Sequence, residues 1–295
     1  MQNSVKTDYC TSESWTILNS VEKSIKRKIE EIGTPLKEWN ISINYGVKTG
    51  LNEAFIISKE TKDALIKSDP KSAEIIRPIL RGRDIKRYSY KFADLWIILA
   101  GFGSHEYLET EYPAIYKHLL QYKEQLSNRG QCRYTSSGKV NTLKDYPGQH
   151  HWLELDNNPS KEYLDDFSKQ KIVYREISNS MDACMVEPDI YLNNKCYILT
   201  GEHLEYLICI FNSRLFNKII LSNANLTGGK GCGFLGNVKI PYPNEDTNKK
   251  FTILYEELQT ASTQDRDTVE EAIENSVCDL YDITGEERKE INSIV

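Results

Sequence analysis

Arginines set among apolar residues are the side chains of this sequence with the clearest binding chemistry. Within residues 80–88, Arg81, Arg83 and Arg87 alternate with apolar residues around one glycine and Asp84. Guanidinium groups form paired hydrogen bonds with carboxylates and phosphates. We expect Asp84 to pair internally with one arginine. The stretch therefore predicts a basic turn that faces a ligand, and it contains no catalytic pair.

A glycine turn at residues 45–55 is a second candidate. Its pattern is that of a strand, a tight turn and a second strand, with Gly50 at a positive φ. Lys48, Thr49 and Asn52 lie at this turn, so they would stand on the same binding surface as the arginines.

Two loops complete the candidate surface. Residues 128–147 carry Arg129, Arg133 and Lys139 with few apolar anchors, and we interpret them as a long, mobile loop. Structureless loops of this length in compact domains are usually functional. A glycine-rich loop further along the chain holds Lys230, for which a solvated loop and a ligand contact both remain open.

The net charge of −6 conceals a strong asymmetry. Residues 245–295 contain 14 acidic and 5 basic residues, whereas residues 48–91 contain 11 basic and 6 acidic ones. Residues 117–144 contain 6 basic residues and 1 acidic residue. Because the acidity lies in the tail, the two central segments are compatible with a polyanionic partner.

Catalytic and metal-binding patterns are missing from the sequence. The nine prolines include no Pro-Pro pair, which amino-methyltransferases of adenine or cytosine place beside the base. Asp189 has no acidic-x-Lys partner nearby, and the adjacent His150 and His151 lack the spacing of a ligand set. The seven cysteines form no C-x-x-C motif, so we expect inert thiols. We predict no catalytic, cofactor or metal site in this chain itself.

The hydrophobic pattern predicts an α+β fold: a mixed or antiparallel, strand-rich domain with inserted helices, followed by a small helical C-terminal region. Expected strands cover 40–45, 53–57, 93–100, 152–155, 171–175, 196–200 and 238–243. Expected helices cover 14–31, 112–126, 201–220, 251–259 and 269–281, the last with Asp267 as N-cap. A capping box at 284–287 predicts a short final helix.

Three regions follow from this pattern. We divide the chain into an N-terminal helix and linker (1–35), a ligand-binding domain (36–244) and an acidic helical region (245–295). No apolar run is long enough to cross a membrane, and the N-terminus has no apolar signal region. We therefore expect a soluble, cytoplasmic protein.

The order of these motifs resembles the C-terminal specificity domain of TaqI-like and Eco57I-like DNA methyltransferases. This is the target recognition domain of type IIG restriction–modification enzymes. The matching motifs are Pro35 with Leu36 and Trp39, then 45–55, 77–88, 112–116 with Leu126 and Arg129, 152–155, Phe167 with 171–174, 207–215, 277–281 and 284–287. The family usually has glycine where Asp282 stands, and the loop 130–148 matches no family pattern.

The resemblance implies recognition of a double-stranded DNA sequence. In such enzymes the methyltransferase and nuclease lie N-terminal, and an adenine is flipped into the methyltransferase pocket. S-adenosylmethionine and Mg²⁺ are implied for those catalytic parts, and this chain is either a fragment or a separate subunit.

The resemblance also gives each candidate side chain a role on DNA. Candidates for base or groove contacts are Arg129, Arg133 and Lys139. Candidates for phosphate or base contacts at the glycine turn are Lys48, Thr49 and Asn52. Candidates for positioning the DNA backbone are Arg81, Arg83, Arg87 and Lys230.

Two alternatives remain open. The chain is a protein-interaction module if its acidic helical end docks a catalytic subunit and its basic surface is incidental. An autonomous enzyme is disfavoured because the catalytic motifs are missing.

Overall fold

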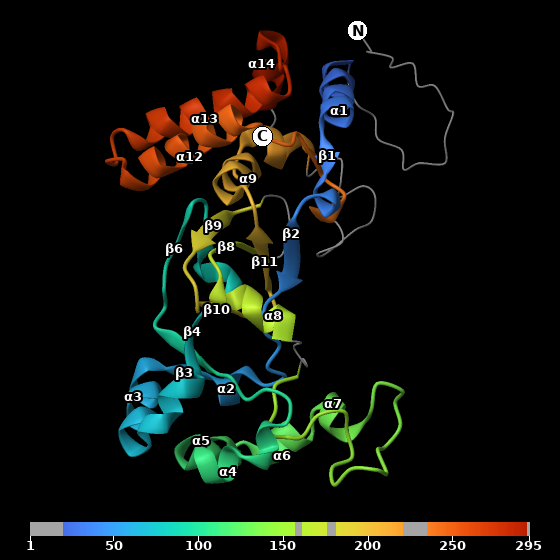
Figure 1. Ribbon diagram of the computed structural model, residues 1–295, viewed down its shortest axis with the longest axis vertical. Coiled ribbons are helices and arrows are strands. Elements are labelled where there is room, and N and C mark those ends of the chain that lie inside the picture. The colour runs from blue at the N-terminus through green and yellow to red at the C-terminus, as the bar shows by residue number, and fades with distance from the viewer. Residues whose placement is uncertain (1–19, 157–160, 176–180, 221–234, 294–295) are drawn as a thin grey trace.

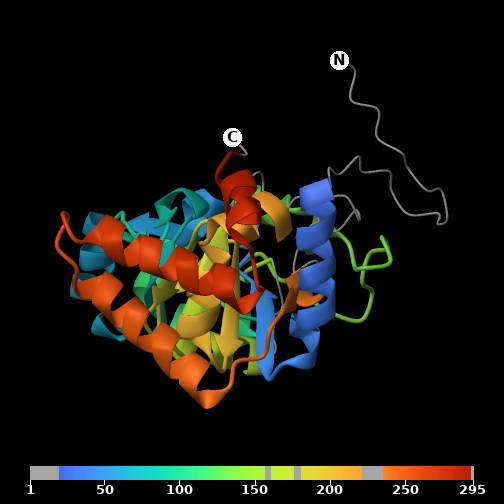
Figure 2. The same ribbon diagram turned by 90° about the horizontal axis from the view of Figure 1, so that it is seen from above.

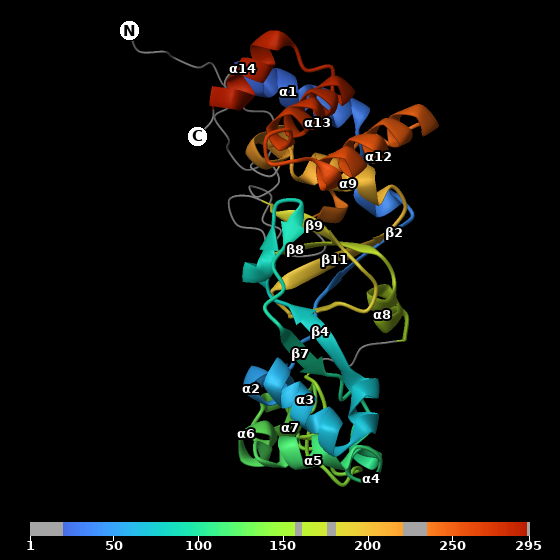
Figure 3. The ribbon, with the colours of Figure 1, turned by 90° about the vertical axis from the view of Figure 1, so that its left-hand side faces the viewer.

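The elements are stacked along the long axis of the molecule (Figures 1 and 3). Helices form one end, two β-sheets follow, and short helices with a long loop form the other end. The computed structural model describes residues 20–156, 161–175, 181–220 and 235–293. The mixture of helices with mainly antiparallel strands confirms the predicted α+β class.

The first sheet is antiparallel and joins segments far apart in the sequence. Its strand order is β2-β11-β8-β9, with bounds Ile41–Tyr45, Cys196–Gly201, Lys171–Arg175 and Ala183–Val186. β-Branched and aromatic residues favour these strands, and Tyr174 stacks on its cross-strand neighbour Tyr197 with ring centroids 5.3 Å apart. The strands expected at 40–45, 171–175 and 196–200 are confirmed.

The second sheet is mixed. Its order is β10-β4-β7-β3, with bounds Tyr191–Leu192, Ile76–Leu80, Leu95–Ile98 and Ile56–Ser58. Only the β10–β4 pair is parallel. The expected hairpin at 45–55 is wrong, because β2 and β3 belong to different sheets. A short helix, α2 (Asn52–Phe55), stands between them and buries Ala54 and Phe55.

The remaining strands form two small two-stranded sheets. The first pairs β1 (Thr34–Pro35) with β12 (Lys239–Ile240), which confirms an edge strand in the segment expected at 238–243. The second pairs β5 (Ile85–Lys86), within the basic turn, with β6 (Ser89–Tyr90), which follows it.

Five helices form one end of the molecule around a shared core (Figures 1 and 2). Their bounds are α1 Ser20–Ile32, α9 Leu204–Phe211, α12 Glu245–Thr260, α13 Arg266–Leu280 and α14 Gly285–Ser293. The apolar stripe of α1 buries Ile25 and Ile29 against this core, as its spacing predicts. The boundaries proposed at 35 and 244 remain predictions.

Helix α9 is shorter than the helix expected at 201–220. The chain leaves the α-helix at Asn212, whose side chain accepts from the Ala183 backbone N–H (3.0 Å) and donates to the Ala183 carbonyl (2.9 Å). These bonds tie the helix end to β9, and a π-helical segment, Phe216–Ile220, follows. A buried amide that bonds another backbone thus ends the regular helix.

The caps of the last helices are mostly as predicted. Thr284 Oγ1 accepts from the Glu287 backbone N–H (3.3 Å), and Glu287 Oε2 accepts from the Thr284 N–H (2.7 Å), which confirms the capping box. Asp282 has a φ of 50°, the left-handed conformation that explains why glycine is usual there. The residue that precedes α13 is Asp265, so the expected N-cap at Asp267 is wrong.

Short helices and turns form the opposite end. Their bounds are α3 Lys59–Ser68, α4 Leu108–Glu111, α5 Pro113–Leu120, α6 Lys123–Ser127 and α7 Gly130–Arg133, while α8 (Lys161–Asp165) lies beside the first sheet. The expected helix 112–126 is thus divided between α5 and α6. Residues 152–155 form turns and no strand, although Leu153 and Leu155 are buried as a strand interior would be. Within the described residues, none of the helices combines the length and apolarity needed to cross a membrane.

Candidate nucleic-acid interface

The glycine turn packs directly against the base of the basic loop. Gly50 has a φ of 72°, which confirms the prediction. A Cβ on Gly50 would lie 2.7 Å from Arg129 Cδ and 2.8 Å from Asp156 Cγ. Both the backbone conformation and the lack of space therefore require glycine.

Arg129 is the centre of this contact. Its Nε donates to the Leu126 carbonyl (3.0 Å), Nη1 to the Thr49 carbonyl (2.8 Å), and Nη2 to the carbonyls of Trp152 (2.9 Å) and Glu154 (2.7 Å). The residue is only 8% exposed. A buried guanidinium does not reach a DNA groove, so we correct the expected role of Arg129 from base contact to support of the loop.

The residues of the glycine turn divide into supporting and surface groups. Thr49 is buried and its Oγ1 donates to Oδ1 of the exposed Asn52 (2.7 Å), so Thr49 supports the turn. Lys48 is half-exposed, and its Nζ lies 3.2 Å from Oδ2 of the buried Asp156. The turn therefore presents Lys48 and Asn52 to solvent.

A second buried carboxylate lies under the other side of the loop. Glu154 accepts from the backbone N–H groups of Gly103 (2.9 Å) and His151 (3.0 Å), and its Oε1 lies 2.5 Å from His105 Nδ1. The His105 and His151 rings stack at 4.6 Å, with Tyr146 edge-on to both. Burial, and then the neighbouring His105, lower the pKa of His151 to about 4. Glu154 and the two imidazoles thus form a closely packed base for the loop.

Backbone hydrogen bonds close the loop above this base. Gln149 N–H donates to the Gln131 carbonyl (2.7 Å) and the Tyr134 carbonyl (3.1 Å). Gly148 lies so close to the backbone of Cys132 that an added Cβ would meet its carbonyl carbon at 2.3 Å. Beyond α7 the loop contains no regular element, as the sequence predicts, but its two ends are fixed together.

The loop carries three exposed cations on this fixed base. Within the described residues, no carboxylate forms an ion pair with Arg133, Lys139 or Lys144. Lys144 Nζ donates to the Tyr146 hydroxyl (2.7 Å) and lies 5.0 Å from the centre of the Phe102 ring. In Figure 1 the loop after α7 extends away from the packed elements. The combination leaves three positive side chains open to an anionic partner.

The basic turn at 80–88 is largely structural. Arg81 Nε and Nη2 donate to the two oxygens of Asp84 at 2.9 and 2.8 Å, which confirms the predicted internal pair. Although burial alone would raise the pKa of Asp84, the hydrogen bonds from Arg81 outweigh it and lower that pKa. Arg83 is exposed and, in the described part of the chain, makes no ion pair. Of these two arginines, only Arg83 is open to a phosphate.

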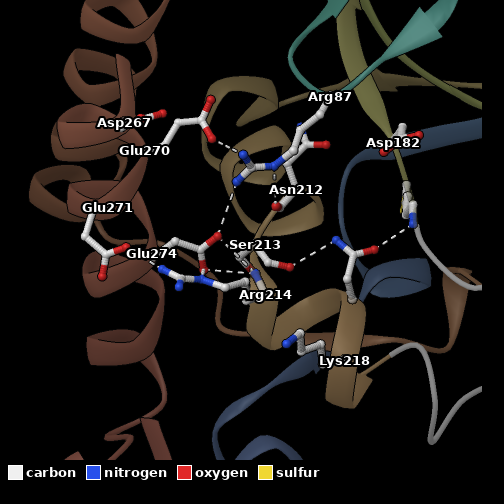
Figure 4. A pocket seen from close by; sticks show the side chains of 12 residues that line it. Arg87, Asp182, Asn212, Ser213, Arg214, Lys218, Asp267, Glu270, Glu271 and Glu274 are labelled. Carbon is white, nitrogen blue, oxygen red and sulfur yellow. Dashed lines mark hydrogen bonds and ion pairs between the residues drawn. The ribbon is translucent and has the colours of Figure 1, made fainter. Parts of the chain in front are cut away.

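Arg87 turns towards the helical end (Figure 4). Its Nε donates to the Asn212 carbonyl (3.0 Å), Nη2 lies 3.3 Å from Glu274 Oε1, and Nη1 pairs with Glu270. These contacts line a cavity of about 460 Å³ between α13 and the turn after α9. Arg87 therefore attaches α13 to the basic turn, and its expected contact with the DNA backbone stays a prediction.

Of the predicted site residues, Lys230 lies outside the described residues, so its position is not given.

The sequence analysis did not identify two buried carboxylates of the site, Glu154 and Asp156. Glu154 and Asp156 alternate with the apolar Leu153 and Leu155, a pattern that would normally put acids on the solvent side of a strand. The feature of the sequence that could have identified them is that two acidic residues closely follow the basic loop.

Metal and thiol chemistry find no support among the described residues. No group of three or more His, Cys, Asp or Glu side chains there is arranged to hold a metal ion. The cysteines described are buried and free, and burial raises the pKa of each: Cys132, Cys184, Cys196, Cys209 and Cys278. Burial and a raised pKa disfavour the thiolate, which is the reactive form, at these five positions; Cys10 and Cys232 lie outside the described residues.

A family model decides what kind of domain carries this loop. The model of the TaqI-like C-terminal specificity domain matches residues 77–230, which is more than half of the chain and includes the basic turn and the basic loop. The chain belongs to the TaqI-like C-terminal specificity domain family. The family that the motif order predicted is therefore confirmed.

Individual relatives of this specificity domain are restriction–modification proteins. The chain is 24% identical over 217 residues to the type II methyltransferase M.MjaIV of Methanocaldococcus jannaschii, covering 70% of the chain and 67% of that protein. The type IIL restriction–modification enzyme MmeI, solved in complex with DNA, matches 89% of the chain with a TM-score of 0.57 and 12% identity. The type IIG restriction endonuclease BpuSI matches 91% with a TM-score of 0.47 and 13% identity.

The chain corresponds to only part of each solved relative. The specificity domain spans 37% of the MmeI chain and 34% of the BpuSI chain. At 12% identity the MmeI match supports a shared fold, including the helical end, because it covers nearly the whole chain.

Proposed function

We propose that this chain recognises a specific sequence in double-stranded DNA, as the specificity domain of a type IIG-like restriction–modification system. The observation that carries the proposal is the loop that displays Arg133, Lys139 and Lys144 without carboxylate partners among the described residues. Its base is held by the buried Arg129 and Glu154. A surface that is both unpaired and rigidly supported suits a polyanion of regular shape.

The exposed polar side chains divide into two roles by type and position. Arg133 and Lys139 on the loop match the acceptor pair of guanine in the major groove, so we assign base contacts to them. Lys48 and Asn52 at the glycine turn and Arg83 at the basic turn suit phosphate contacts that fix register.

Catalysis is assigned to partners of this chain. The methyltransferase and nuclease parts would be supplied by an upstream segment or a separate subunit, together with S-adenosylmethionine and Mg²⁺. In this division, the specificity domain holds the target so that the base reaches the methyltransferase pocket.

Selection from a pool of randomised duplexes, followed by salt titration, tests the proposal. The full chain should enrich a defined sequence, and log Kd should rise steeply with log salt because phosphate contacts release counterions. Replacing Arg133 and Lys139 together by alanine should weaken binding and relax the selected sequence at the bases that they contact. The matched control is the double replacement of Lys249 and Lys250, which removes the same charge from α12.

The outcomes separate DNA recognition from protein docking. If no duplex sequence is enriched and binding does not depend on salt, DNA recognition is refuted and the protein-docking module is favoured. An equal effect of the loop and α12 variants would mean that net charge, and not the loop, governs binding.

A further inference from the structure

The tip of the basic loop exposes an unusual amount of apolar surface. Leu143 is 95% exposed, and Val140 and Tyr134 in the same loop are 55% and 41% exposed. Phe102, against which Lys144 lies, is 54% exposed. Single exposed apolar residues are common, but three in one loop beside a fourth mark a contact surface.

The tip is held in place by its own hydrogen bonds. The Leu143 N–H donates to Asn141 Oδ1 (2.9 Å), and the Asn141 N–H donates to the Pro147 carbonyl (2.7 Å). The Thr135 N–H donates to the Lys139 carbonyl (2.8 Å) and closes a second turn. Leu143 is therefore presented in a defined position, which reduces the entropy lost on binding.

Cations surround this apolar tip. Lys144 follows Leu143 directly, and Lys139 precedes Val140. The loop extends beyond the packed elements in both Figure 1 and Figure 2, so it can enter a recess of a partner. An apolar side chain flanked by positive charges complements a groove of duplex DNA, where stacked bases lie between two rows of phosphates.

We propose that Leu143 is an apolar wedge that enters a DNA groove and partly unstacks one base step, while the adjacent Lys144 holds a flanking phosphate. This inference rests on the proposed function and adds a second source of specificity to it. Unstacking is least costly at flexible pyrimidine–purine steps, so the wedge selects sequence through deformability without a hydrogen bond to a base. Leu143 is then a specificity-determining residue.

DNA bending by the full chain tests the wedge. The probe is a 30-bp duplex of the sequence that the wild type enriches from a randomised pool, labelled at both ends for energy transfer. The wild type should shorten the end-to-end distance, and Leu143→Ala should abolish the shortening and raise Kd roughly tenfold, as for loss of one buried leucine contact. Leu143→Lys should also abolish bending while it keeps salt-dependent binding, because it adds a cation and removes the wedge.

The control and the opposing outcomes keep the wedge distinct from DNA binding itself. Ile253→Ala removes a 45% exposed apolar side chain from α12 and should change neither bending nor Kd. If the wild type enriches and binds a sequence but Leu143→Ala bends it equally, the wedge is refuted and DNA recognition stands. If the wild type binds no duplex, or binds anionic phospholipid vesicles in preference to it, both proposals fall.

Discussion

The two ends of the molecule use the same cationic residue types for different purposes. At the helical end, the guanidinium groups of Arg87 and Arg214 converge on Glu274, with nitrogen–oxygen distances of 3.3 and 3.6 Å, and Lys28 lies 2.7 Å from Glu287. At the loop end, Arg133 and Lys139 make no ion pair within the described residues. The first group fastens helices together, and the second remains open to a partner.

The carboxylates explain the difference. At the helical end they project from α13 and α14 towards the cations of neighbouring elements. At the loop end, Glu154 and Asp156 are buried beneath the loop, where they bind backbone N–H groups and the supporting Arg129. A count of charges along the sequence does not separate these cases, because it records charge and not which neighbour each charge faces.

Arg129→Ala should produce the largest effect of any single change at the loop end. It leaves four buried carbonyl acceptors without this donor and removes one of the two cations beside the buried Asp156, so we expect a loss of about 3–5 kcal/mol in the free energy of unfolding. Equilibrium urea unfolding of the full chain measures this loss.

Arg133→Ala, four residues further along the same loop, is the matched control for that variant. Its side chain is exposed, so its free energy of unfolding should change by less than about 0.5 kcal/mol. A loss in Arg129→Ala as small as in Arg133→Ala would show that Arg129 does not support the loop, and the proposed division between supporting and displayed cations would fail.

The strands of the first sheet were predictable because their patterns are local. Residues 171–175 and 196–200 carry continuous apolar and aromatic runs, which bury on both faces of a central strand and need no knowledge of their partners. The capping box at 284–287 is equally local, since both hydrogen bonds lie within four residues.

The glycine turn shows why the rest was not predictable. A glycine between two apolar runs is the usual pattern of a hairpin, but here Gly50 avoids the side chain of Arg129, 79 residues away in sequence. The same non-local contact buries the arginine to which the resemblance gave a role on DNA. Arg133 and Lys139 could be chosen correctly as exposed cations, whereas the burial of Arg129 depends on carbonyls from three separate segments.

Arg87→Ala tests the helical end and should have an intermediate effect. It removes bonds to Glu270, Glu274 and the Asn212 carbonyl and leaves Glu274 buried, where burial already raises its pKa. Because the guanidinium is partly exposed, we expect a loss of about 1–2 kcal/mol in unfolding free energy and unchanged affinity for the selected duplex. A large loss of affinity without loss of stability would instead place Arg87 on the DNA and abolish the contrast between the two ends.

The smallest effect should be a difference in acid sensitivity between the ends. Burial and the neighbouring His105 lower the pKa of His151 from 6.5 to about 4, so the unfolded state binds the proton more tightly and the loop end loses stability as pH falls from 6.5 towards 4. At the helical end, burial opposes ionisation of Glu287, but hydrogen bonds from Lys28 and Thr284 lower its pKa from 4.5 to about 2. That contribution is present above pH 4.5 and is lost only as pH falls towards 2.

Two variants measure these windows separately. His151→Phe keeps an aromatic ring against His105 and should flatten the pH dependence of unfolding between pH 6.5 and 4 by about 1 kcal/mol. Glu287→Gln should leave that window unchanged and lose about 1 kcal/mol relative to the wild type above pH 4.5, with the two curves converging near pH 2. Hydrogen exchange at pH 5 should show faster exchange in 130–150 than in α13 and α14, because only the loop end has begun to lose its contribution. If hydrogen exchange becomes equally faster at both ends, the group formed by His105, His151 and Glu154 is not the cause of the acid sensitivity of the loop.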